Sequence, residues 1–148
     1  MLPKKNLSSL FIFLTLTGLQ PVFSETWTGS SSSAWEDGSN WSNGTVPAEG
    51  NRVFLNAGSV IDYTVGDLNL RAIEQSGGVL NILDSEFRVT ELASATTTFD
   101  GTVNQSGGFA DINRIFMGNS DGVEAQYNLS GGEFRIARSI TSPSISEA

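Results

Sequence analysis

The tripeptide Ser-Gly-Gly occurs three times and constrains the fold of this chain more than any other feature. The copies begin at Ser76, Ser106 and Ser130, and the first interval is longer than the second. Three residues before each Ser is a β-favouring residue, and two and four residues after each second Gly are apolar residues. In chain order these sets are Ile73, Val103 and Tyr127; Leu80, Ala110 and Phe134; and Ile82, Ile112 and Ile136. Each copy is therefore interpreted as a strand, a glycine corner and a second strand.

The spacing within each copy predicts which side chains face inward. Apolar residues two positions apart share one face of a strand, and we expect the residues between them, Asn81, Asp111 and Arg135, to face solvent. One such unit cannot bury its apolar side alone, but stacked units can. Stacking predicts an internal column formed by Ile82, Ile112 and Ile136.

Paired glycines suit the corners of stacked strands. Glycine adopts positive φ without strain, and it has no Cβ to obstruct the neighbouring turn. We therefore assign a structural role to six glycines: Gly77, Gly78, Gly107, Gly108, Gly131 and Gly132.

These patterns predict an all-β fold, a parallel β-helix or β-solenoid of about three to four coils over residues 59–148. No segment keeps a helical apolar period. Asn104 and Asn128 share one register and predict an amide ladder, which Glu74 interrupts in the first copy. The alternative is an antiparallel β-sandwich with glycine-rich turns, which requires no fixed register between copies.

The region 25–58 contains all three tryptophans of the chain, Trp27, Trp35 and Trp41. An open first coil exposes strand edges and apolar interior, so large aromatic side chains there predict an N-terminal cap. The alternative is a carbohydrate-binding module in which Trp35 and Trp41 stack on sugar rings.

Residues 1–24 have the pattern of a cleaved signal peptide. Lys4 and Lys5 precede a short apolar stretch, and Val22 and Ser24 are small enough for the cleavage site. The stretch is too short to span a bilayer, and no second long apolar segment follows it. We therefore expect export with cleavage after Ser24 and no transmembrane segment in the mature chain; an uncleaved amphipathic anchor is the alternative.

The amino-acid composition excludes several kinds of catalytic group, metal ligand and partner. The chain has no Cys and no His, which excludes disulfides, thiolate nucleophiles and the commonest general base and metal ligand. Its net charge is −8, and loss of Lys4 and Lys5 makes the mature chain still more acidic. Such a surface repels phosphate, so we expect no nucleic-acid partner. A small exported protein without disulfides favours a bacterial protein stabilised by stacking.

A catalytic site is not expected. The nearest carboxylate pairs, Asp84 with Glu86 and Asp121 with Glu124, are interpreted as solvated charges, and residues 119–122 as a turn without a full calcium ligand set. No catalytic residue, metal or other cofactor is therefore assigned. A β-helix polysaccharide lyase is kept as the least favoured alternative.

The segments Trp27-Thr28-Gly29, Asn40-Trp41, Val46-Pro47 and Asn51 to Leu55, with the later Asn-Gln-Ser-Gly-Gly corner at Asn104, carry a family resemblance. They resemble bacterial exported proteins with autotransporter-associated β-strand repeats. The resemblance implies a passenger-like, right-handed parallel β-helix with a cell-surface or adhesive role. The chain departs from that pattern in 139–148, which is Ser-rich and lacks an apolar anchor.

Taken together, these features predict a non-catalytic, exported structural or adhesive β-solenoid module. The chain is expected to be either released freely or the front portion of a longer autotransporter-like protein. The expected partners are extracellular polysaccharide or other surface proteins.

Overall fold

The structure, a computed structural model, describes residues 23–90 and 96–136. Within these residues the chain forms short β-strands, one 3-10 helix, η1 (Gly38–Asn40), and no α-helix. Along most strands buried and half-exposed residues alternate, as expected when one face of a strand packs on a core. The strands are β1 (Ser24–Thr26), β2 (Arg52–Leu55), β3 (Val60–Tyr63), β4 (Leu68–Asn69), β5 (Ala72–Gln75), β6 (Val79–Ile82), β7 (Glu86–Val89), β8 (Thr96–Phe99), β9 (Thr102–Gln105), β10 (Phe109–Ile112), β11 (Ile115–Met117), β12 (Gln126–Leu129) and β13 (Glu133–Ile136).

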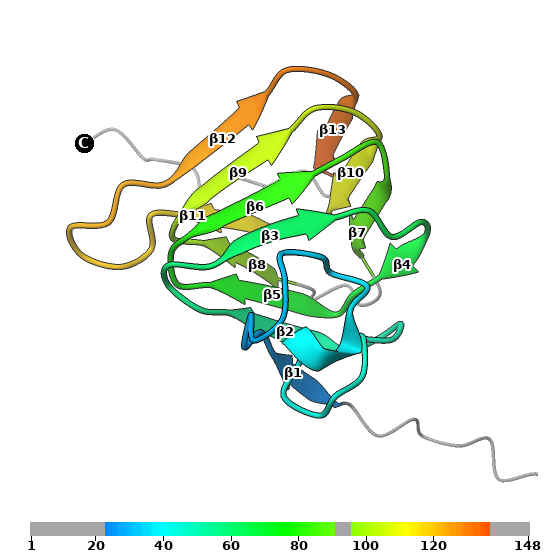
Figure 1. Cartoon of the computed structure of the whole chain (residues 1–148). Coiled ribbons are helices and arrows are strands. Elements are labelled where there is room, and N and C mark those ends of the chain that lie inside the picture. Colours follow the sequence, from blue (N-terminus) through cyan, green and yellow to red (C-terminus); the bar gives the residue numbers. More distant parts are fainter. Residues whose placement is uncertain (1–22, 91–95, 137–148) are drawn as a thin grey trace, which may run out of the picture.

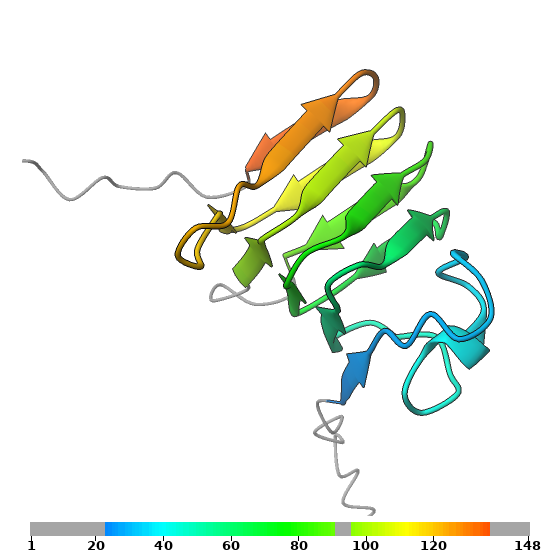
Figure 2. The same cartoon turned by 60° about the vertical axis from the view of Figure 1, so that its left-hand side comes forward.

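The strands build three parallel sheets (Figure 1). Sheet 1 has the order β1-β2-β5-β8-β11, sheet 2 has the order β3-β6-β9-β12, and sheet 3 has the order β4-β7-β10-β13. Each set of three consecutive strands from β2 onward visits all three sheets once, and the described residues contain four such coils, which are stacked in Figure 2. The predicted all-β parallel solenoid of three to four coils is confirmed.

Neighbouring coils stack residue upon residue. On sheet 2, Val60 pairs with Val79, Val79 with Thr102, and Thr102 with Gln126. The number of residues between stacked partners is smallest for the first pair and nearly equal for the two later pairs. The coils differ mainly at their corners, because the strands between them keep an unbroken register.

This stacking corrects the alignment of the first Ser-Gly-Gly copy. Ile112 pairs with Ile136 on sheet 3, whereas Ile82 lies on sheet 2 and pairs with Gln105. The copy at Ser76 forms the corner between sheets 1 and 2, and the two later copies form the next corner, between sheets 2 and 3. The longer first interval thus spans one coil and one further side, and the single column of Ile82, Ile112 and Ile136 is wrong.

The glycine corners are crowded by the coil beneath them. A Cβ on Gly108, whose φ is +66°, would lie 2.1 Å from the backbone oxygen of Ser85. A Cβ on Gly131, whose φ is not in the left-handed region, would still lie 2.3 Å from the oxygen of Ser106. Close approach of backbones therefore requires glycine at both positions, and backbone conformation adds a second requirement at Gly108.

One continuous core runs through the coils and includes the N-terminal indoles. Ring contacts link Trp35 to Tyr63 and Tyr63 to Phe87, with centroid distances of 5.0 Å in both cases. Edge-to-face packing of this kind adds to the stabilisation from apolar burial.

The segment before β2 forms an incomplete coil that closes one end of the core. β1 pairs with β2 on sheet 1, Ala34 bridges Asp62 on sheet 2, and the amide of Gly50 donates to the carbonyl of Asn69 on sheet 3. It therefore touches all three sheets beneath the first complete coil (Figures 1 and 2). By its pairing β2 belongs to that first coil, so the coils begin within the range 25–58 that we assigned to the cap.

Candidate functional site

The tryptophans proposed as a sugar platform are inside the protein. Trp35 and Trp41 are 0% and 2% exposed, and their rings pack edge to face with centroids 4.6 Å apart. The Nε1 of Trp41 donates a 2.8 Å hydrogen bond to the backbone oxygen of Trp35. Neither indole presents a face to a ligand, so the assignment of Trp35 and Trp41 as carbohydrate-binding residues is wrong. Both rings are buried because they pack against the apolar end of the core and cover it.

A polar ladder runs up the outer face of sheet 2. Nδ2 of Asn128 donates to Oδ1 of Asn104, and Nδ2 of Asn104 donates to Oδ1 of Asn81, both over 3.0 Å. Asn81 then donates to Asp62 over 2.8 Å, and the hydroxyl of Ser33 donates to the same carboxylate over 2.6 Å. The predicted contact between Asn104 and Asn128 is present.

The ladder is not interrupted by Glu74, because that residue lies on sheet 1, where it pairs with Thr98. The rung below Asn104 is Asn81, one side of the coil later than the sequence alignment implied. The first Ser-Gly-Gly copy lies at the corner between sheets 1 and 2, which places both Ile82 and Asn81 on sheet 2. The polar ladder is therefore continuous from Ser33 to Asn128.

Two buried glutamines bond to the corners, and sequence reasoning missed them. Nε2 of Gln75 donates to the carbonyl of Gly78 over 3.2 Å. Nε2 of Gln105 donates to the carbonyls of Gly107 and Glu133 over 3.2 and 3.0 Å. Each Gln directly precedes a Ser-Gly-Gly copy, so the signal was the longer motif Gln-Ser-Gly-Gly, present at two of the three corners.

The outer face of sheet 3 also departs from expectation at one residue. Asp111, predicted to face solvent, is 7% exposed, and its carboxylate accepts a 2.5 Å ion-pair contact from Arg135 of the next coil. This contact raises the pKa of the Arg135 guanidinium above its ordinary value. Arg135 also lies over the Phe109 ring, so the long side chain covers the shorter ones beside it.

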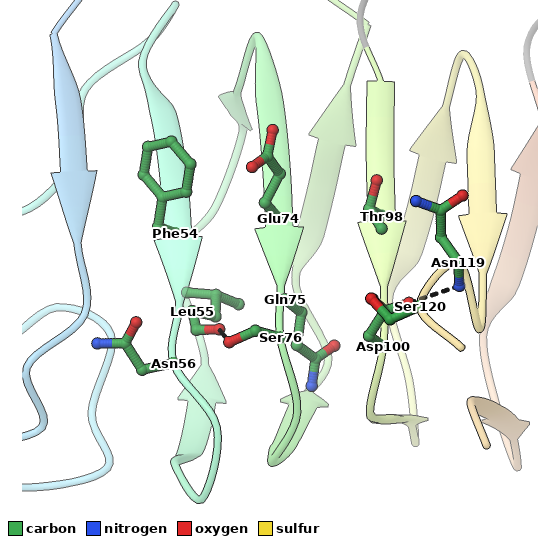
Figure 3. A pocket seen from close by; sticks show the side chains of 10 residues that line it. All are labelled: Phe54, Leu55, Asn56, Glu74, Gln75, Ser76, Thr98, Asp100, Asn119 and Ser120. Atoms are coloured by element: carbon green, nitrogen blue, oxygen red, sulfur yellow. Dashed lines mark hydrogen bonds between the residues drawn. The ribbon is translucent and has the colours of Figure 1, made fainter. Parts of the chain in front are cut away.

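An open groove of about 380 Å³ lies on the outer face of sheet 1 and is the candidate binding site (Figure 3). Phe54, Glu74 and Thr98 come from successive coils in direct register and form a row across it. Backbone pairing fixes this row, since residues stacked in a parallel sheet lie about 4.8 Å apart. The residues that line the groove are Phe54, Leu55, Asn56, Glu74, Gln75, Ser76, Thr98, Asp100, Asn119 and Ser120.

One end of the groove is built by Asp100, which follows β8 and is 8% exposed. Its carboxylate accepts hydrogen bonds from the amide of Asn119 over 2.7 Å and from the hydroxyl of Ser120 over 2.6 Å. The amide of Val123 donates to the carbonyl of Ser120 over 3.2 Å, so this segment is a turn, as the sequence indicated. Asp100 thereby holds the turn against the sheet, where Asn119 and Ser120 line the groove.

The other end of the groove is aromatic and charged. The guanidinium of Arg52 lies 5.0 Å from the centroid of the Phe54 ring and forms an ion pair with Glu74. The groove thus combines one ring with hydroxyl, amide and carboxylate groups, which suits a neutral, polar ligand rich in hydroxyls.

Asp84 and Glu86, one of the carboxylate pairs singled out in the sequence, do not line this groove. Glu86 forms an ion pair with Arg88 over 2.9 Å, and Asp84 lies at a corner beneath Gly107. In residues 23–90 and 96–136, no three His, Cys, Asp or Glu side chains come together as a metal site would require.

Comparison of the chain with protein-family models, with curated proteins and with solved structures gives no match in any of the three. No helix in the described part of the chain is long and apolar enough to cross a membrane. The functional interpretation therefore depends on the solenoid, its polar ladder and the groove on sheet 1.

Proposed function

We propose that this chain is a non-catalytic, structural or adhesive β-solenoid module of an exported bacterial surface protein. The observation that carries the proposal is the continuous stack of four in-register coils, which has one apolar core and one end closed by buried tryptophans. Stability in such a stack comes from contacts between neighbouring coils and needs no disulfides. An acidic, cysteine-free solenoid of this kind suits an extended element outside the cell.

Two further features support export and surface location, and both come from the sequence. The signal-peptide pattern occupies 1–24, of which 1–22 lie outside the described residues. The resemblance to autotransporter-associated β-strand repeats involves Trp27, Trp41 and Asn104, which the structure places in the cap and in the polar ladder. Residues 139–148, where the chain departs from that family, also lie outside the described residues.

Export is tested by producing the full chain in a bacterial host and sequencing the N-terminus of the extracellular protein. The mature chain is expected to begin at Glu25, and intact cells treated with protease should lose any copy held at the surface. An unprocessed chain that stays in the cytoplasm would contradict the proposal.

A second function, carbohydrate binding, is favoured by the groove and no longer by the tryptophans. Phe54 offers an aromatic side chain at one end, and Glu74, Thr98 and Asn119 follow it across the groove with polar groups. Acidic and amide oxygens accept hydrogen bonds from sugar hydroxyls, while an aromatic face packs on the apolar side of a sugar ring. An adhesive module would use this groove to hold extracellular polysaccharide.

The test is calorimetric titration with the polysaccharides that bind on a glycan array. We expect Phe54→Ala and Thr98→Val to weaken binding at least tenfold. Phe109→Ala is the matched control, because Phe109 lies on sheet 3 with Arg135 5.0 Å from its ring, as Arg52 is from Phe54. Equal losses in Phe54→Ala and Phe109→Ala, or no binding by the wild type, would contradict a site in the groove.

A further inference from the structure

The groove on sheet 1 is built by three coils that each contribute one pair of residues. The first member of each pair lies on the outer face of β2, β5 or β8, and the second directly follows the end of that strand. In coil order the pairs are Phe54 with Asn56, Glu74 with Ser76, and Thr98 with Asp100. Stacked strands lie about 4.8 Å apart, so equivalent positions repeat at this interval along the solenoid axis.

Backbone hydrogen bonds keep both rows of these residues in register. The first members of the pairs stack directly on one another in the parallel sheet. Past the strand ends, the amide of Ser76 donates to the carbonyl of Leu55, and the amide of Asp100 donates to the carbonyl of Gln75, each over 2.9 Å. The two rows therefore run side by side across the strands, as Figure 3 shows, and the groove follows the solenoid axis.

The polar groups of the groove present mainly hydrogen-bond acceptors. Nδ2 of Asn56 and the hydroxyl of Ser76 each donate to a backbone carbonyl, over 2.9 and 3.2 Å. These bonds use the hydroxyl hydrogen and one amide hydrogen, while the side-chain oxygens of both residues can accept. The ionised carboxylates of Glu74 and Asp100 can only accept. A matching ligand must therefore supply donors at each coil, as the hydroxyls of a sugar chain do.

The charge of the groove favours a neutral ligand. Glu74 and Asp100 both line it, and the whole chain has a net charge of −8. Arg52 forms an ion pair with Glu74, and none of the described residues that line the groove is basic. An anionic chain would be repelled along the length of such a groove.

We propose that the groove binds a linear, neutral, β-1,4-linked polysaccharide that lies parallel to the solenoid axis, with one sugar unit on each of the three coils. The inference rests on the carbohydrate-binding function proposed above, and it adds the direction and the length of the bound segment. Successive rings of such an extended glycan advance by nearly the spacing of the coils, so each ring meets an equivalent pair of residues.

The two ends of the groove define the bound segment. At the first coil the Phe54 side chain can pack on the apolar side of one ring. At the third coil Asp100 holds Asn119 and Ser120 beside the last position. Three sugar units therefore fill the groove, and any further units project beyond it.

The first experiment is calorimetric titration of the protein with β-1,4-linked glucose oligosaccharides of one to six units. The affinity should rise at least tenfold from one unit to three, and by less than about threefold from three units to six. β-1,4-linked glucuronic acid oligosaccharides of the same lengths should bind at least tenfold more weakly, because Glu74 and Asp100 repel their carboxylates.

The outcomes separate this inference from carbohydrate binding in general. Equal affinity for one and three units, affinity that keeps rising to six units, or equal binding of the acidic series would overturn the inference and leave carbohydrate binding intact. Binding of other glycans in the groove, with no binding of the glucose series, would do the same. Failure of every glycan on an array would overturn both.

A second experiment tests the middle position with Ser76→Ala, for which Ser130→Ala is the matched control. The hydroxyl of each Ser donates to a backbone carbonyl over 3.2 Å at a Ser-Gly-Gly corner, but of the two only Ser76 lines the groove. Ser76→Ala should weaken binding of the trisaccharide at least fivefold, while Ser130→Ala should bind it as the wild type does. Thermal melting checks that both variants are folded. Equal affinity of the two folded variants would overturn the inference.

Discussion

Single residues decide whether two coils can approach each other, and glycine shows this most directly. At Gly108 a Cβ would meet the Ser85 backbone oxygen at 2.1 Å, whereas at Gly58, which also has positive φ, it would meet nothing within 4 Å. Gly108→Ala should therefore lower the free energy of unfolding by several kcal/mol, and Gly58→Ala by only about 1 kcal/mol. Urea denaturation measures both. Similar losses at the two positions would mean that backbone strain, and not contact between coils, explains the glycine.

Two tyrosines, the buried Tyr63 and the half-buried Tyr127, give the protein a predictable response to alkali. Burial raises the pKa of Tyr63 and of Tyr127 above the ordinary value of 10.0, and the nearby carboxylates of Asp67 and Glu86 add to the effect at Tyr63. The unfolded chain loses these protons first, so stability is intact below about pH 10 and falls as the pH rises above it. Each tyrosine contributes a slope of about 1.4 kcal/mol per pH unit in that range.

Chemical unfolding between about pH 8 and pH 11 measures that slope. Tyr63→Phe removes one titrating group and should flatten the alkaline fall, even though it loses the 3.0 Å hydrogen bond from Tyr63 to the carbonyl of Glu86. An equally steep fall in Tyr63→Phe would show that other groups control the alkaline response.

At the residue scale, sequence alternation predicted inward and outward faces well, because the period of two is a property of the extended backbone. It failed where packing between distant residues decides the outcome. Ile82 is one such case, because it pairs with Gln105 and not with Ile112, whereas the cap predicted from Trp35 and Trp41 is present. The groove residues Phe54, Glu74 and Thr98 were also missed, since their proximity depends on the lengths of the coils that separate them in the chain.

Among the elements, the polar ladder on sheet 2 offers the clearest test of coil register. Asn104 bonds to both Asn81 and Asn128, whereas among the described residues the side chain of Asn128 bonds to Asn104 alone. Asn104→Ala should cost about 1–2 kcal/mol, because it breaks two hydrogen bonds, and Asn128→Ala about half as much. A double-mutant cycle between Asn81 and Asn104 should show coupling. Additive effects in that cycle would contradict direct contact between their side chains.

The same elements explain why the first Ser-Gly-Gly copy was misplaced. Both kinds of corner bring backbones together tightly, with Gly78 against Ser59 and Gly108 against Ser85, so the same tripeptide suits either of them. Local sequence identifies a corner but does not say which corner it is. That distinction comes from pairing between strands a full coil apart in the chain, which the sequence reports only through spacing.

For the whole molecule, the stacking of coils predicts an order of unfolding. All three tryptophans lie in the cap, so their fluorescence reports that end alone. The middle coils contact neighbours on both sides, while β11, β12 and β13 have neighbours on one side within the described chain. Hydrogen exchange should therefore be slowest in β5–β8 and fastest in β11–β13. Uniform protection along the chain would contradict a stack stabilised by nearest neighbours.

Because the register on sheet 2 is unbroken, duplication of one coil in the gene would change the length of the solenoid. Thr102 lies directly under Gln126, so a tandem copy of 102–125 would bring the chain back to the same side of the solenoid. Each such duplication would lengthen the rod by about 4.8 Å and leave every other contact in phase. Unequal recombination could therefore change the length of the solenoid by one coil at a time. Each added coil would repeat core contacts that the protein already has.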